Sequence, residues 1–98
     1  MSSTTDFIAE LFRAANQIET LTSSERVRLI ERAAATIQAQ RDLLATRERV
    51  VPLTYDITAD LEKMKAQAPQ MPEVLSAVVM LKCADEIRRL RILLETND

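Results

Sequence analysis

Residues 72–95 read PEVLSAVVMLKCADEIRRLRILLE, and this stretch decides the fold class. Pro72 followed by Glu73 is typical of the first turn of a helix. Apolar residues then recur three and four positions apart, which places them on one face of a helix. That stripe consists of Met80, Cys83, Ile87, Leu90 and Leu94. We therefore expect a long helix over about residues 72–96.

The first part of this helix carries more apolar surface than one face can hold. Residues 74–81 read VLSAVVML, and a helix that is apolar nearly all round is buried on more than one side. Leu75 and Val79, four positions apart, share one face, while Val78 lies on another. We expect one face to meet the chain's own second long helix and the other to meet a second copy of the chain. The candidate oligomer interface consists of Val74, Leu75, Val78, Val79 and Leu81.

A second long helix is predicted over about 22–50. Thr22 stands three residues before Glu25, the spacing of a capping box in which each side chain binds the other residue's backbone N–H. Pro52 ends the helix, because proline disfavours helical geometry at the residue before it.

The remaining segments predict two shorter helices and no strand. Apolar spacing indicates one helix at roughly 6–20 and another at about 56–67, and Pro69 and Pro72 break the chain after the latter. The prediction is an all-α single domain over residues 1–98, a small helical bundle. Its core is an antiparallel pair of the two long helices, 22–50 and 72–96.

The helix lengths indicate an oligomer. A helix of about 27 residues is roughly 40 Å long, whereas a compact domain of this size is only about 30–35 Å across. The chain is therefore either an elongated monomer or an oligomer that covers the protruding ends. The apolar excess in 74–81 favours the oligomer, and two-fold dimers are the commonest form.

The composition excludes large classes of chemistry. The 98 residues include no His, no Gly and a single Cys. A catalytic triad or histidine metal site needs His, and a phosphate-binding loop needs Gly. A lone Cys forms neither an intrachain disulfide nor an iron–sulfur cluster. We therefore expect no catalytic residue, metal ligand or cofactor.

The N-terminal sequence lacks the pattern of a signal peptide, and the longest apolar run, 77–81, is far too short to span a membrane. The expected location is cytoplasmic, with no membrane partner.

Positive charge is concentrated in the second predicted helix. Residues 25–51 hold six Arg against four carboxylates, although the whole chain has a net charge of −2. Arg26, Arg28 and Arg32 lie near the helix N-terminus, where positive charge is mildly unfavourable, so they are candidate partner-binding residues. Nucleic acid is an alternative partner but is not favoured, because Glu25 and Glu31 are interleaved with these arginines.

The sequence favours a non-catalytic function. We expect a small regulatory protein that acts as a homodimer and binds another protein, for example an anti-activator or inhibitor. Small helical chains of this kind commonly serve as bacterial, phage or plasmid accessory proteins, an argument from size and class alone. Two alternatives remain: a nucleic-acid-binding accessory protein that uses the Arg-rich helix, and a small helical isomerase without a cofactor.

Overall fold

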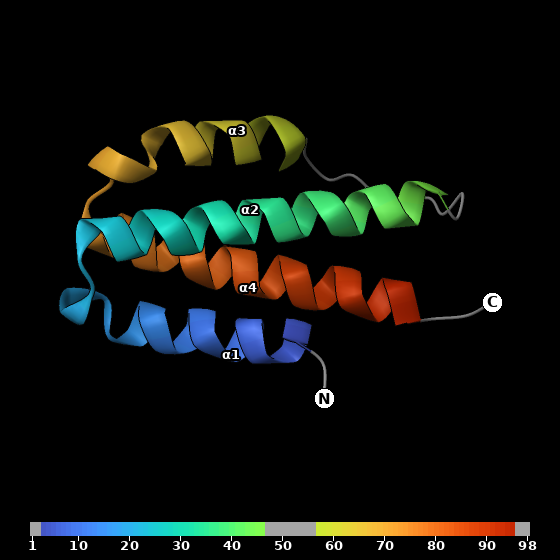
Figure 1. Ribbon diagram of the computed structural model, residues 1–98, viewed down its shortest axis with the longest axis horizontal. Coiled ribbons are helices and arrows are strands. Elements are labelled where there is room, and N and C mark those ends of the chain that lie inside the picture. Colours follow the sequence, from blue (N-terminus) through green and yellow to red (C-terminus); the bar gives the residue numbers. More distant parts are fainter. Residues whose placement is uncertain (1–2, 47–56, 96–98) are drawn as a thin grey trace.

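Four α-helices form the described part of the chain (Figure 1). The computed structural model describes residues 3–46 and 57–95, with the side chains of the third helix described from residue 62 on. The helices are α1 (Ser3–Asn16), α2 (Ser23–Thr46), α3 (Ile57–Gln67) and α4 (Glu73–Glu95). Two short 3-10 helices, η1 (Ile18–Thr20) and η2 (Ala68–Gln70), precede α2 and α4. No strand occurs in these residues, so the predicted all-α class is confirmed.

The predicted capping box starts α2. The backbone N–H of Glu25 donates to Thr22 Oγ1 at 3.1 Å, and the backbone N–H of Thr22 donates to Glu25 Oε1 at 2.8 Å. These bonds satisfy two donors that have no partner within the helix. The bonds from Thr22, backbone first, also lower the pKa of Glu25 below its usual value, because they stabilise the charged carboxylate.

The other helix ends lie close to their predicted positions, with one exception. Helices α3 and α4 agree with the predicted 56–67 and 72–96 to within a residue at each end. The first predicted helix, 6–20, begins earlier and is divided into α1 and η1, because the N–H of Gln17 binds the carbonyls of both Arg13 and Ala14 and tightens the last turn. The predicted end of the second helix near residue 50 lies outside the described residues.

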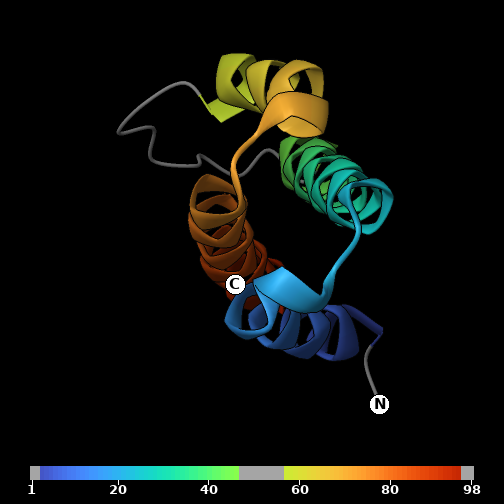
Figure 2. The same cartoon turned by 90° about the vertical axis from the view of Figure 1, so that its left-hand side faces the viewer.

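Helix α4 lies between α1 and α2, and α3 packs against α2 on the side away from α1 (Figures 1 and 2). The two long helices pack against each other as predicted, but their predicted antiparallel direction is wrong. They run parallel, because α3 returns the chain to the end where α2 began (Figure 1). The hydrogen bond from Gln40 to Ile87 agrees, since both residues lie in the second half of their helices.

The core is an apolar cluster between the three helices α1, α2 and α4. Helix α1 contributes Phe7, Ile8 and Leu11, and the fully buried Ile30, Ile37, Met80, Ile87 and Leu90 come from α2 and α4. Small side chains at Ala33, Ala34 and Ala84 are also buried and let the helices approach closely. This cluster fixes the rotation of α4 about its own axis, and therefore which of its side chains face outward.

The molecule is elongated, with dimensions of 43 × 30 × 18 Å. The 24 residues of α2 span about 36 Å and lie along the longest dimension (Figure 1). The second predicted helix was too long for a compact domain of this size, and the subunit accommodates it by being elongated. The oligomeric state stays a prediction.

Candidate protein-protein interface

Helix α4 has one buried face and one exposed apolar face. The buried face holds Ser76, Met80, Cys83, Ala84, Ile87 and Leu90. On the opposite side the exposed fractions are 77% for Val74, 40% for Val78, 36% for Leu81 and 51% for Ile92. Together with the exposed Asp85 and Arg88, these four residues form a line that we name the outward stripe. Successive members are four or three residues apart, so they share one side of the helix.

The structure divides the predicted oligomer interface into two parts. Val74, Val78 and Leu81 belong to the outward stripe. Leu75 is exposed beside it at 47%, whereas Val79 is partly buried and packs against the core cluster. Val79 therefore contributes to the subunit's own stability, and the other four remain open to a partner.

A groove lies between α3 and α4, over α2. Its volume is about 570 Å³, within the range of small-molecule sites. Apolar lining comes from Ile37, Met64, Val79 and Cys83, and polar lining comes from Lys63, Gln67, Lys82, Asp85, Glu86 and Arg89. The sequence predicted Val79 and Cys83 on apolar faces, but it did not predict a groove. The groove forms because α3 packs mainly on α2 and leaves α4 open on this side.

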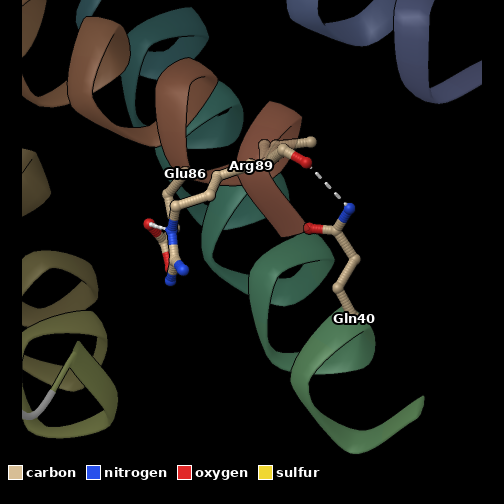
Figure 3. A network of polar contacts seen from close by, with 4 residues as sticks. Gln40, Glu86 and Arg89 are labelled. Atoms are coloured by element: carbon tan, nitrogen blue, oxygen red, sulfur yellow. Dashed lines mark hydrogen bonds and ion pairs between the residues drawn. The ribbon is translucent and has the colours of Figure 1, made fainter. Parts of the chain in front are cut away.

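The thiol that lines this groove is poorly suited to nucleophilic chemistry. Burial raises the pKa of the Cys83 thiol to about 11, with a smaller contribution from the nearby Glu86 carboxylate. The thiol is therefore protonated at neutral pH, and the thiolate is the nucleophile. Glu86 is held by Arg89, whose Nε and Nη2 donate to the two carboxylate oxygens at 3.0 and 2.7 Å (Figure 3).

Two of the three candidate partner-binding arginines are engaged within the chain. Arg26 donates to the backbone carbonyl of Leu21 at 3.3 Å and to Ser23 Oγ at 3.2 Å. Arg32 donates to Glu10 Oε1 at 3.3 Å, and its guanidinium lies 4.0 Å from the centre of the Phe7 ring. Arg28 is exposed. Arg28 and Arg32, four residues apart, share one side of α2, whereas Arg26 does not, so the three side chains do not form one continuous basic surface.

Neither a metal site nor a membrane-spanning helix occurs in the described ranges, 3–46 and 57–95. No group of three or more His, Cys, Asp or Glu side chains there is arranged to hold a metal ion. No helix there combines the length and apolar character needed to cross a bilayer.

Three features of α2 and α4 were not predicted. Ile92 continues the outward stripe. The spacing of four and three residues, followed from Leu81 through Asp85 and Arg88, would have predicted its position on this side of the helix. Gln40 is buried and donates from Nε2 to the carbonyl of Ile87 at 3.0 Å (Figure 3), while its Oε1 has no partner among the described residues. Ser76 is fully buried, and its hydroxyl also has no partner there.

No protein-family model matches the chain, and no curated protein or solved structure shows significant similarity to it.

Proposed function

We propose that this chain is a small, non-catalytic helical protein that acts as a homodimer and regulates a partner protein by binding it. The observation that carries the proposal is the outward stripe of α4, which exposes four large apolar side chains on the face opposite the core. Burying a Val or Leu side chain is worth roughly 1.5–3 kcal/mol, so covering several of them on α4 favours association.

The remaining surfaces support binding rather than catalysis. The one thiol is protonated at neutral pH, and the Glu86 carboxylate in the groove is held by Arg89. Arg26 and Arg32 bind groups of their own chain, which weakens the case for nucleic acid. The regulatory role, as an anti-activator or inhibitor, rests on size and class. The proposal includes a cytoplasmic location, where a single cysteine stays reduced.

The test is the mass of the protein in solution after a charge is placed on the outward stripe. Val78→Asp and Leu81→Asp put a carboxylate on a face that is exposed in the subunit, so each variant should keep its helical circular dichroism. Light scattering at micromolar concentration should show that wild type is a dimer and that both variants are monomers, since an unpaired charge in an apolar interface is costly.

Two controls separate dissociation from unfolding. Lys82→Ala changes an exposed residue outside the stripe and should leave the mass unchanged. Val79→Asp places the charge against the core cluster and should instead unfold the chain. The interface is wrong if wild type is dimeric and neither Val78→Asp nor Leu81→Asp changes the mass.

A further inference from the structure

The outward stripe has the spacing of a helix-pairing seam. Successive members lie four, three, four, three and four residues apart, as in the heptad pattern of paired helices. Three of its four apolar members, Val74, Val78 and Leu81, lie at the N-terminal end. The oppositely charged Asp85 and Arg88 follow, and the fourth apolar member, Ile92, ends the seam. The other side of α4 is already occupied by the core, so this seam is available to a helix from outside the subunit.

We propose that the seam is covered by the same helix of a second copy, in an antiparallel arrangement with Val78 opposite the partner's Leu81. This inference rests on the proposed homodimer and adds its geometry. In a two-fold dimer, each patch meets itself. A parallel pair would set Asp85 against the partner's Asp85 and Arg88 against the partner's Arg88, which is repulsive. An antiparallel pair separates these like charges.

Three antiparallel alignments keep the seam in contact, and the chemistry of the stripe selects one. With Leu81 opposite the partner's Asp85, the central apolar side chains Val78 and Leu81 face charges, and only Val74 at the end meets an apolar side chain, the partner's Ile92. With Asp85 opposite the partner's Arg88, opposite charges occupy the centre and Leu81 meets the partner's Ile92. Val74, the most exposed of the apolar residues at 77%, and Val78 then have no apolar residue opposite them. The proposed alignment instead places Val78 and Leu81 of both copies at the centre. Interfaces generally have an apolar centre and a polar rim.

The rim of the proposed alignment is complementary in charge. It places Asp85 opposite the partner's Val74 at the edge and Arg88 within about one helical turn of the partner's Glu73. Arg88 and Glu73 are both exposed, and neither has an ion-pair partner among residues 3–46 and 57–95. Two symmetric Arg88–Glu73 pairs would therefore flank the apolar centre. Ile92 lies outside this contact and stays exposed; single exposed apolar residues are common on protein surfaces.

Disulfide formation between two single-cysteine variants tests the alignment. Val78→Cys and Leu81→Cys are prepared separately in the otherwise native chain and shown by light scattering to be dimeric; one carries a tag. They are mixed, allowed to exchange subunits and oxidised mildly. Cys83 stays in place, because its burial and raised pKa protect it, and wild type treated in the same way is the control. The mixture should form the mixed covalent dimer at least tenfold faster than either variant alone forms its own.

Each of the other possible cross-linking results would contradict a particular part of the proposal. In the proposed alignment the two copies of position 78 are offset by about 4.5 Å along the helix, so rapid cross-linking of each variant with itself would indicate a parallel pair. A mixture of Asp85→Cys and Arg88→Cys that cross-links faster than the first mixture would select the alignment with central charges. If wild type is dimeric and none of these variants cross-links, α4 is not the interface. If wild type is a monomer, the proposed function fails as well.

Discussion

Replacing Ser76 with Ala should stabilise the protein. Ser76 is fully buried on α4, and its hydroxyl has no hydrogen-bond partner among the described residues. A buried polar group without a partner costs about 1–3 kcal/mol, and alanine is also the better helix former by up to about 0.5 kcal/mol. The void left by one oxygen atom offsets only part of this gain. We expect Ser76→Ala to raise the free energy of unfolding by about 1–2 kcal/mol.

The assay is thermal and urea unfolding followed by circular dichroism, at one fixed protein concentration because dimer stability depends on concentration. For a domain of this size, 1 kcal/mol corresponds to a shift of about 4–8 °C in Tm. Ser24→Ala, at an exposed position in α2, is the matched control and should change stability by less than about 0.5 kcal/mol. An unchanged or lower Tm for Ser76→Ala would show that the hydroxyl is hydrogen-bonded in the folded protein and refute the reasoning.

Three further predictions concern the contribution of single side chains to stability. Burial raises the pKa of the Cys83 thiol from 9.0 to about 11. The contribution of the protonated thiol to the free energy of unfolding is therefore complete below pH 9 and is lost as pH rises through 11. In urea unfolding, wild type should lose more stability than Cys83→Ala between pH 8 and pH 11. Thr22→Ala removes the cap of α2 and should lower the free energy of unfolding by about 1 kcal/mol, and no change in the urea midpoint would count against the capping box. Arg32→Ala removes the contacts with Phe7 and Glu10 and should cost about 1 kcal/mol at low salt; a variant as stable as wild type would show that these exposed contacts contribute nothing.

The sequence predicted the helices well because their signals are local. The Thr22–Glu25 capping box and the break at Pro69 and Pro72 act within a few residues, and the helices begin and end where these signals place them. The direction of the long pair was not predictable in the same way. It depends on α3 returning the chain along α2, which is a long-range property of packing.

The candidate interface was predictable only in part. The apolar excess of residues 74–81 signalled a second partner for α4, and Val74, Leu75, Val78 and Leu81 are exposed as that reasoning requires. The assignment of Val79 depended on the rotation of α4, which the contacts with α1 and α2 set. The groove beside α3 depends on the same packing, so no local pattern in the sequence indicated it.

The mass of the wild-type protein in solution tests the central claim most directly. Size-exclusion chromatography with light scattering at micromolar concentration should give twice the 11.1 kDa mass of one chain. A mass equal to that of one chain over the same concentrations would contradict the account, because the outward stripe of α4 would then remain exposed to water.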